Sequence, residues 1–389
     1  MNYIIFDYAR EQLLPLTFTR SVCDLRIGIL TIREKWNRLL ESETSTLTED
    51  YLSVKFPCKS ADDNVLINGG VCPNNKLLSA INTLEVGDRL VKDGKLLAAR
   101  ISGQFSRSSL DSVDGTEYSG EILSVEHPWD IFSKNGEAIE QDFELLTSGR
   151  QSEKLSESNT VIGDGAIFLE EGAKAEACIF NTTSGPIYLG KNSEVMEGAV
   201  IRGPFALCDN STVKLAAKIY GPTTIGPHSK IGGEVNNSVI IGYSNKGHDG
   251  FLGNSVLGEW CNLGADTNNS NLKNNYDQVR VWSYSEQRFA KTGLQFCGLI
   301  MGDHSKSGIN TMFNTGTVVG VSANVFGSGF PRTFIPSFQW GGAAGFTEYN
   351  KEKALATAER VMSRRGIELD KTEKDILIKV HNLTECYRN

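Results

Sequence analysis

Residues 189–232 read LGKNSEVMEGAVIRGPFALCDNSTVKLAAKIYGPTTIGPHSKIG, and the spacing of their aliphatic side chains decides the fold. Eight aliphatic residues stand six positions apart without a gap: Leu189, Val195, Ile201, Leu207, Val213, Ile219, Ile225 and Ile231. Amphipathic helices and half-buried strands repeat at about 3.6 and about 2 residues instead. A six-residue repeat predicts one short strand and one corner per unit, and three units close a triangular coil of a parallel β-helix. The alternative, an irregular β-sandwich, would show a period of two.

The repeat continues on both sides of this stretch, with interruptions that we expect to be loops. Its further positions are Phe251, Leu257, Leu263, Phe313, Val319 and Val325, with weaker matches at Ile162 and Phe168. The 39 glycines among 389 residues exceed average usage, as suits a region that turns often. Coils stacked at about 4.8 Å would align the aliphatic side chains in one core column. We therefore expect a β-helix over residues 159–342.

The first 150 residues lack this repeat and are expected to form an α/β domain. Tyr3–Phe6 and Val65–Ile67 are predicted strands, and apolar residues between Ile29 and Leu40 keep to one helix face. A closing helix is predicted over residues 129–146. The polar, serine-rich segment 147–159 then predicts a linker and a domain boundary near residue 150.

Two helices are expected after the β-helix, within residues 347–389. Thr347 is expected to cap a helix that runs to about Arg365 and stops at Gly366. Asp370 and Glu373 form a predicted capping box for the second helix. We expect this pair of helices to cover the last coil.

Composition limits the partners and the compartment. The net charge is −8, and no cluster of Lys and Arg interleaved with aromatic residues offsets it, so a nucleic-acid partner is not expected. No segment approaches the roughly 18 consecutive apolar residues of a membrane span, and the start lacks a signal peptide's pattern. Eight scattered cysteines without a C-x-x-C pair indicate reduced thiols and argue against structural zinc. We expect a cytoplasmic protein with no membrane partner.

The chemistry is expected where the repeat fails, and its longest failure lies between Ile231 and Phe251. That segment contains His248, one of five histidines. An imidazole with a pKa near neutrality suits deprotonation of an ammonium at pH 7. A surface histidine with no role is the alternative. His304 is a weaker candidate, and the remaining three are expected to be structural or exposed: His127, His228 and His381.

The stretch from Lys246 to Tyr276 resembles the acetyltransferase half of the bifunctional UDP-N-acetylglucosamine pyrophosphorylase/glucosamine-1-phosphate N-acetyltransferase family. Family members carry Gly-His, an aromatic residue three positions on, a Gly, then Asn-hydrophobic-Gly-Ala-Gly-Thr and Asn-Tyr-Asp. The matching residues here are Gly247, His248, Phe251, Gly253, Asn262–Thr267 and Asn275–Asp277. Asn236 and Asn237 stand where the family has a basic pair, and Asp266 replaces a glycine. These departures leave the acceptor sugar open.

The resemblance implies a left-handed β-helix, a homotrimer with its site between subunits, and an acetyl-CoA-dependent transfer to an amino sugar with His248 as general base. It places sugar contacts at Phe251, Asn262, Asn275 and Tyr276, and coenzyme contacts at Ala265 and Thr267. A sugar phosphate also needs cations, for which the nearest candidates are Lys218, Lys246 and Arg280.

The amino-terminal residues resemble the sugar nucleotidyltransferases of the same family, in shortened form. Pro15-Leu16-Thr17 matches, but no glycine stands between Met1 and Gly28 to let a backbone approach a pyrophosphate. Asn68-Gly69-Gly70 stands where the family's metal-binding Asp is expected. The candidates for remnants of the nucleotide site are Arg10, Arg20, Asp24 and Arg26.

Four functions follow from these patterns. The first is acetyl-CoA-dependent acyl transfer to a sugar phosphate or nucleotide sugar, with no resident metal. The second is nucleotidyl transfer to a sugar 1-phosphate from UTP or dTTP, which alone would require Mg²⁺. The third is a metalloenzyme with His228, His248 and His304 as ligands. The fourth is a non-catalytic scaffold or sensor that binds sugar nucleotides.

Overall fold

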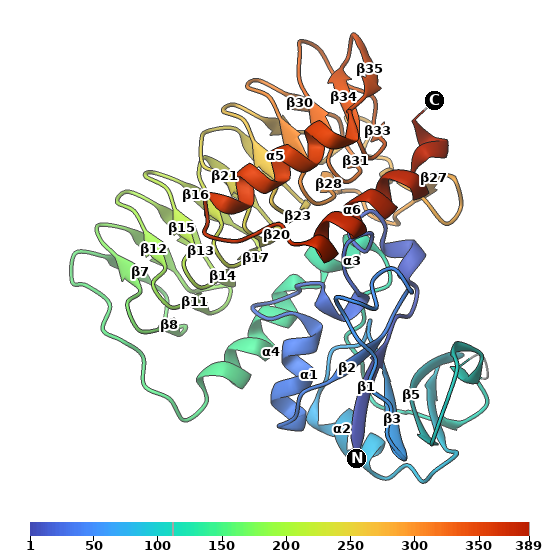
Figure 1. Ribbon diagram of the computed structural model, residues 1–389. Coiled ribbons are helices and arrows are strands. Elements are labelled where there is room, and N and C mark those ends of the chain that lie inside the picture. The colour runs from blue at the N-terminus through green and yellow to red at the C-terminus, as the bar shows by residue number, and fades with distance from the viewer. Residues whose placement is uncertain (111–112, 389) are drawn as a thin grey trace. The chain divides into compact units, whose positions relative to one another are not determined.

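The computed structural model describes residues 1–110 and 113–388 (Figure 1). Contacts divide the chain into two compact units. The first consists of Met1–Leu13, Thr19–Leu25 and Leu30–Glu126, and the second of Leu14–Phe18, Arg26–Ile29 and His127–Asn389. The boundary of these units thus falls at residue 126, whereas we expected a boundary near residue 150.

The first unit is built on a mixed six-stranded sheet in the order β2-β1-β3-β5-β4-β6. Its strands are β1 (Asn2–Phe6), β2 (Ser45–Leu47), β3 (Asp63–Asn68), β4 (Arg89–Lys92), β5 (Lys95–Ser102) and β6 (Thr116–Glu117). Strand β1 runs parallel to β2 and β3, and β5 runs antiparallel to β3 and β4. Both predicted strands of this region are confirmed.

Helices α1 (Ile32–Leu40) and α2 (Asn75–Asn82) accompany this sheet, with short 3₁₀ turns at Arg10–Leu13, Val22–Asp24 and Arg107–Leu110. Helix α1 begins three residues later than the apolar pattern suggested, because Thr31 caps it. The Thr31 hydroxyl accepts from the Glu34 amide at 3.2 Å, and the Glu34 carboxylate accepts from the Thr31 amide at 2.6 Å.

The second unit contains the expected parallel β-helix, with three faces of parallel strands. The first face holds β7 (Thr160–Ile162), β10 (Ile179–Asn181), β13 (Val200–Arg202), β16 (Lys218–Tyr220), β19 (Glu234–Asn236) and β22 (Phe251–Gly253). The second holds β8 (Ile167–Leu169), β11 (Ile187–Leu189), β14 (Phe205–Leu207), β17 (Thr223–Ile225), β20 (Val239–Gly242), β23 (Val256–Glu259), β28 (Leu299–Met301), β31 (Thr317–Val319) and β33 (Phe334–Ile335).

The third face completes each coil. It holds β9 (Lys174–Ala175), β12 (Glu194–Val195), β15 (Thr212–Val213), β18 (Lys230–Ile231), β21 (Asn245–Lys246), β24 (Asn262–Leu263), β29 (Lys306–Ser307), β32 (Asn324–Val325) and β34 (Gln339–Gly342), with β35 (Gly345–Glu348) antiparallel at its end. Strands β25 (Asn268–Asn269) and β30 (Met312–Phe313) form a parallel pair, and a hairpin of β26 (Arg280–Ser283) and β27 (Arg288–Lys291) interrupts the repeat.

All eight aliphatic residues of the opening stretch point into the prism and are at most 2% exposed, which confirms the central prediction. The register shifts where one coil is short. Val213 pairs with Ile231, 18 residues on, but Ile231 pairs with Lys246, only 15 residues on. Leu257, Leu263, Phe313, Val319 and Val325 lie in the core as predicted.

Three core positions predicted from the period are wrong. The inward residue after the short coil is Leu252, so Phe251 points outward. In the first coil Val161, not Ile162, pairs with the inward Phe180, and Ile162 is 46% exposed. Phe168 pairs with the outward-facing Tyr188 and is buried beneath Phe143 of a helix.

The corner between the second and third faces carries one left-handed residue per coil. Eight non-glycine residues hold φ between +51° and +61°: Asn192, Asn210, His228, Tyr243, Trp260, His304, Ser322 and Phe338. The rings of His228, Tyr243, Trp260 and His304 stack successively, with centroids 4.8, 4.4 and 6.3 Å apart. We call these four residues the aromatic ladder. Its stacking offsets part of the cost of the left-handed backbone.

Helices α3 (Pro128–Ser133) and α4 (Asn135–Thr147) replace the single predicted closing helix and belong to the second unit. Buried Asn135 joins α4 to the second face: its side chain accepts from the Gly28 amide at 2.8 Å and donates to the Thr224 hydroxyl at 3.1 Å. The outward residues of that face are also buried, whereas Ile179 and Val200 on the first face are 38% and 42% exposed.

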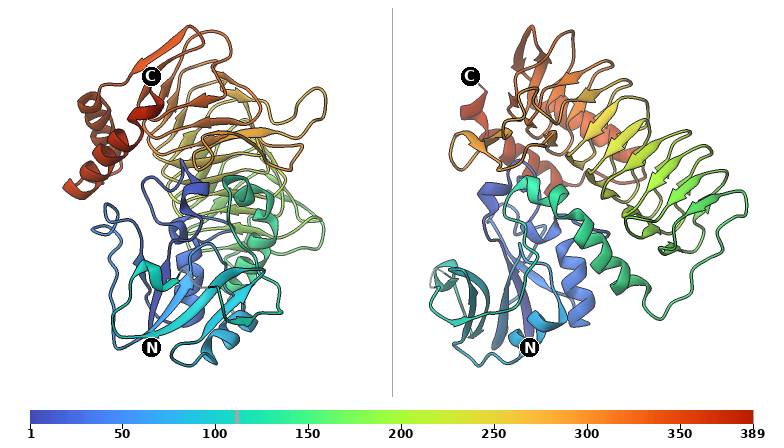
Figure 2. Two further views of the ribbon diagram at one scale, coloured as in Figure 1. Left: turned by 90° about the vertical axis from the view of Figure 1, so that its right-hand side faces the viewer. Right: turned by 180° about the vertical axis from the view of Figure 1, so that it is seen from behind.

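Helices α5 (Lys351–Ser363) and α6 (Lys371–Leu383) lie alongside the coils, followed by a short turn at Glu385–Tyr387 (Figures 1 and 2). As expected, the carboxyl-terminal segment contacts the last coil: the His381 ring of α6 lies edge-on to Phe338 with centroids 4.9 Å apart, and the Gln339 side chain donates to the Arg388 carbonyl at 3.4 Å. The Tyr349 amide, just before α5, donates to the Phe338 carbonyl in the last coil. Arg365, just after α5, helps to lower the pKa of His228, which lies several coils earlier. Asn350, not Thr347, caps α5, and Asp370 caps α6 as predicted.

None of the helices in the described part of the chain combines the length and the apolar character that crossing a bilayer requires.

The inward column predicts the stability of the β-helix. Ile225 is fully buried, so Ile225→Ala should lower the free energy of unfolding by about 2–5 kcal/mol through lost burial and a cavity. Leu215, an aliphatic residue of a neighbouring coil, is 62% exposed, and Leu215→Ala should change it by no more than about 0.5 kcal/mol. Urea unfolding followed by circular dichroism measures both. Equal effects of the two substitutions would contradict the assigned register.

Candidate active site

The candidate site lies at the corner between the third and first faces, where β21 meets β22. Four residues turn this corner, Gly247–Gly250, as in the coils of β12 and β15, whereas the preceding coil turns it with only two, Gly232 and Gly233. Gly250 is required, because its φ is +121° and a Cβ would lie 2.3 Å from the Thr267 carbonyl oxygen. The shortened corner lies against this loop, since a Cβ on Gly233 would be 2.9 Å from the His248 carbonyl oxygen. His248 and Asp249 are both exposed.

Lys246 occupies the inward position of the short coil, between Ile231 and Leu263. Only 2% of the residue is exposed. Its ammonium donates to the carbonyl oxygens of Gly232 at 2.9 Å and His248 at 2.7 Å. Lys246 therefore does not bind a substrate phosphate, as we had expected, but fixes the backbone that carries His248 from inside.

Burial lowers the pKa of Lys246 to about 8, although the carboxylates of Asp249 and Asp266 act in the opposite direction. Asp249 and Asp266 belong to consecutive turns of this corner, since the Asp266 amide donates to the Asp249 carbonyl at 2.9 Å. The Lys246 ammonium and the carboxylates of Asp249 and Asp266 therefore lie near one another around the His248 loop.

The imidazole of His248 has no hydrogen-bond partner within the described ranges, and it is open to a ligand. Phe251 is half-buried and outward-facing on the adjoining first face, in one column with Glu234 and the exposed Lys218. Exposed Asn262 lies on the third face, where its side chain accepts from Asn245 at 2.9 Å. These residues surround one corner, and Ala265 is half-buried at the same corner one coil later.

Thr267 does not fit the predicted contact with a coenzyme. It is 4% exposed, and its hydroxyl is hydrogen-bonded to the Ser307 hydroxyl at 2.9 Å and donates to the Gly308 carbonyl oxygen at 3.3 Å, both in the next coil. Its side chain serves coil stacking inside the prism.

Asn275, Tyr276 and Arg280 lie elsewhere in the same chain. They belong to the long excursion between β25 on the first face and β28 on the second face, so they leave the prism at a different corner from His248. Asn275 donates to the Asp277 carboxylate at 2.6 Å, and Tyr276 is 65% exposed. Within a single chain, these three residues therefore do not lie together with His248.

A cavity of about 440 Å³, open to solvent, lies against this excursion and is lined by Lys273, Asp277, Gln278, Arg280 and Lys291. Sequence reasoning found Arg280 but missed Lys273 and Lys291. Their convergence depends on the pairing of Arg280 with Lys291 across the hairpin, which follows from its turn and not from a motif.

The three histidines proposed as metal ligands do not converge. His228 and His304 belong to the aromatic ladder, at a different corner from His248. Across residues 1–110 and 113–388, no three His, Cys, Asp or Glu side chains are grouped as ligands of a metal ion would be.

The predicted remnants of a nucleotide site are engaged in the fold. Asp24 forms a two-pronged ion pair with Arg33 at 2.7 and 2.8 Å. Arg10 donates to the Tyr51 hydroxyl at 2.5 Å. Arg20 is 4% exposed. Arg26 is 6% exposed, belongs to the second unit and donates to the Ile241 carbonyl at 3.1 Å. These four side chains do not form a common phosphate site. Arg20 and Arg26 cannot reach a phosphate because both are buried.

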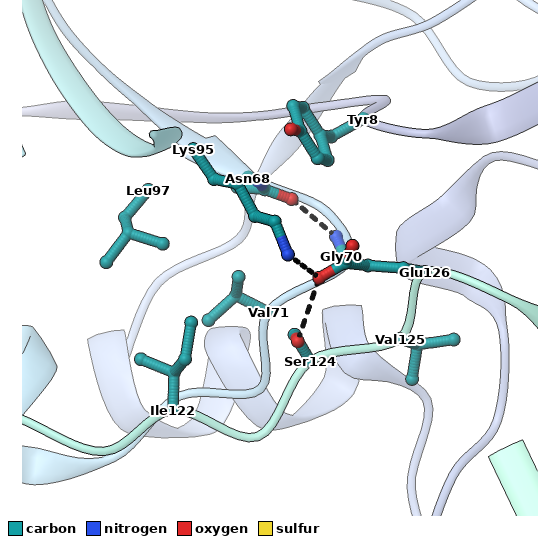
Figure 3. Close-up of a pocket in the computed structure, with 10 residues that line it drawn as sticks. All are labelled: Tyr8, Asn68, Gly70, Val71, Lys95, Leu97, Ile122, Ser124, Val125 and Glu126. Atoms are coloured by element: carbon teal, nitrogen blue, oxygen red, sulfur yellow. Dashed lines mark hydrogen bonds and ion pairs between the residues drawn. The ribbon is translucent and has the colours of Figure 1, made fainter. Parts of the chain in front are cut away.

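The first unit instead holds a small cavity of about 10 Å³, room for about one water molecule, at the carboxyl ends of β1 and β3 (Figure 3). This edge is where parallel α/β sheets bind ligands. The Lys95 ammonium lies 2.6 Å from the Glu126 carboxylate, which holds the pKa of Lys95 above its usual value. Asn68 accepts from the Gly70 amide at 2.9 Å and donates to the Leu96 carbonyl at 2.8 Å. The sequence did not point to Lys95 and Glu126, because only folding brings them to the same cavity as Asn68.

Comparisons with known proteins agree with this architecture. Residues 3–151 match the family described as sugar nucleotidyl transferase. The chain is 35% identical over 147 residues to the uncharacterized acetyltransferase YaiX of Escherichia coli K12, covering 37% of this chain and 63% of that protein. It is 24% identical over 256 residues to the bifunctional protein GlmU of Methanococcus aeolicus, covering 66% and 54%.

A third relative is the bifunctional sugar-1-phosphate nucleotidylyltransferase/acetyltransferase of Sulfurisphaera tokodaii, 26% identical over 264 residues that cover 67% of this chain and 57% of that protein. The chain spans between 54% and 63% of the length of these three relatives. The matches confirm that the chain is related to the bifunctional family that its motifs resemble.

The burial of Lys246 predicts a pH dependence of stability. Its pKa is lowered in the folded state to about 8 from an ordinary value of 10.5. Between these values the unfolded chain holds a proton that the folded chain has lost, so stability should rise with pH. The free energy of unfolding of the natural protein, relative to Lys246→Met, should increase by roughly 3 kcal/mol from pH 8 to pH 10.5.

Urea unfolding at half-unit steps of pH measures this difference. Lys230→Met, which removes an exposed lysine of the same face, is the control and should show no such trend against the natural protein. A flat difference between the natural protein and Lys246→Met would show that the ammonium is not buried in the prism.

Proposed function

We propose that the chain is an acyltransferase that moves an acyl group from an acyl-CoA, such as acetyl-CoA, to the amino group of a sugar phosphate or nucleotide sugar. The observation that carries the proposal is the corner at His248, where a turn of ordinary length next to the shortened Gly232-Gly233 corner presents an open imidazole beside Phe251 and Asn262. The relatives' names, which include acetyltransferase and bifunctional nucleotidylyltransferase/acetyltransferase, support it.

His248 acts as the general base in this reaction. The acceptor's nitrogen attacks the thioester carbonyl, the nitrogen loses a proton to the imidazole, and the carbon–sulfur bond breaks to release the coenzyme's thiol. Lys246 is a positioning residue, since its ammonium holds the His248 carbonyl from within the prism. Phe251 and Asn262 contact the sugar, and Ala265 lies beside the coenzyme.

The active form is a homotrimer whose site is shared between copies. Support comes from the separation of His248 from Asn275 and Tyr276 within one chain, which a neighbouring copy can remedy. The first face also leaves Ile179 and Val200 exposed, as a face that meets another copy would. All eight cysteines are free, and we place the reaction in the cytoplasm.

His248→Ala should lower acyl transfer by about 10²- to 10⁴-fold, because the general base is lost. Thiol release from acetyl-CoA with glucosamine 1-phosphate and a panel of amino sugars is the measurement. Glu197→Ala, at an exposed position of the same corner three coils earlier, should retain activity. Full activity of His248→Ala would remove the imidazole from the mechanism.

A mixing experiment tests the shared site. His248→Ala and Tyr276→Ala chains, each inactive alone, should regain part of the activity after they are unfolded together and refolded. Mixed trimers then contain some sites with both residues intact. No recovery in refolded trimers would place both residues in the site of a single chain.

Nucleotidyl transfer is a second candidate function, favoured by the family match of residues 3–151 and the cavity at the carboxyl edge of the sheet. Magnesium does not fit this cavity well. Glu126 is the one carboxylate among the described residues that line it, and the Lys95 ammonium already engages Glu126. We therefore derive no step through a metal.

If this second function holds, the full chain releases pyrophosphate from UTP or dTTP with a sugar 1-phosphate, and Lys95→Met lowers the rate at least tenfold. Lys76→Met, an exposed lysine of α2, serves as the control. A colorimetric pyrophosphate assay with and without Mg²⁺ reads the outcome. Absence of release under both conditions would leave the first unit a binding or packing role.

A further inference from the structure

The hairpin of β26 and β27 places two cations directly opposite each other. Arg280 and Lys291 are cross-strand partners at the open end of the hairpin, and both are exposed. Like charges in this arrangement destabilise a hairpin. The arrangement therefore calls for a compensating anion.

Lys273 adds a third cation to the same cavity, whose volume is about 440 Å³. Its ammonium donates to the Gln278 carbonyl at 3.0 Å and keeps further donors available. Asp277 is the carboxylate on the lining, and it accepts from Asn275 at 2.6 Å. In the described ranges, Lys273, Arg280 and Lys291 form no ion pair with a carboxylate. Three cations thus line one cavity of a chain whose net charge is −8.

The base of the hairpin is held firmly, so the cations keep their positions. The Val279 amide donates to the Leu294 carbonyl at 2.8 Å, and the Thr292 amide donates back to the Val279 carbonyl at 3.0 Å. Trp282 stacks on Phe334 with ring centroids 4.3 Å apart. Because the backbone is already held, an anion that binds here has to order only the side chains of the cations.

We propose that Lys273, Arg280 and Lys291 form a phosphate-binding site that holds the phosphate or diphosphate group of a ligand. A guanidinium and two ammonium groups around one cavity match the charge and the several oxygens of a phosphate ester. The site deepens the proposed acyl transfer, on which it rests for its biological ligand. The phosphate can come from the acceptor sugar or from the coenzyme, and the experiment separates these sources.

The test is Lys291→Glu, which removes one cation and gives Arg280 an opposite charge across the hairpin. Thermal stability should stay equal or rise, because a repulsive cross-strand pair becomes attractive. Affinity for inorganic pyrophosphate, measured by isothermal titration calorimetry on the full chain at low salt, should fall at least tenfold. Arg280→Gln is a second variant and should also weaken binding at least tenfold.

Arg288→Glu is the matched control. It makes the same change of charge at the tip of the same hairpin, where Arg288 is paired with Glu286 at 2.7 Å outside the cavity lining. Its affinity for pyrophosphate should stay within about twofold of the natural protein's. Equal pyrophosphate affinity in Lys291→Glu and the natural protein, or no pyrophosphate binding by the natural protein at millimolar concentration, would overturn the proposal.

Titrations with UDP, coenzyme A and dephospho-coenzyme A identify the source of the phosphate. Loss of UDP binding alone in Lys291→Glu assigns the site to a nucleotide-sugar acceptor, whereas loss of coenzyme A binding assigns it to the donor. These titrations require no turnover. Failure of acyl transfer with intact, Lys291-dependent pyrophosphate binding would contradict the proposed reaction while leaving the anion site in place.

Discussion

The stacking of side chains in the core column is the interaction on which the rest of the β-helix depends. Most coils contribute an apolar residue to each face, and these residues pack into one core cluster in which each stacks on its counterparts in the neighbouring coils. The six-residue period follows from this contact. A polar corner residue, a loop or a raised segment is tolerated wherever it leaves the column intact.

The candidate site shows how much departure the column permits. A coil shortened by three residues would break the stack, but Lys246 fills the inward position with its long alkyl stem and sends its ammonium to two backbone carbonyls. The same residue thereby joins the core to the loop that carries His248. Lys246 both fills the core and fixes the backbone at His248. It is therefore buried, and the expected role of binding a substrate phosphate at the surface is wrong.

Sequence alone predicted the β-helix, its eight aligned aliphatic residues and the location of the irregular corner, because each rests on local spacing. It could not locate the short coil: Phe251 and Leu252 fit the period almost equally, and only pairing with Val235 makes Leu252 the inward residue. Helix α4 was assigned to the first domain because Asn135 reaches Gly28 and Thr224 only in three dimensions. The cations Lys273 and Lys291 escaped notice for the same reason, since hairpin pairing, not sequence spacing, brings Lys291 to Arg280.

The aromatic ladder spans the coils on both sides of the short one, from His228 to His304. Where the core column is interrupted by a lysine, four rings stacked at the neighbouring corner therefore supply a second line of contact between the same coils. The coils before His228 have no rings at this corner. The segment around His248 is therefore joined to its neighbouring coils by two columns of contact, whereas the early coils lack the second one.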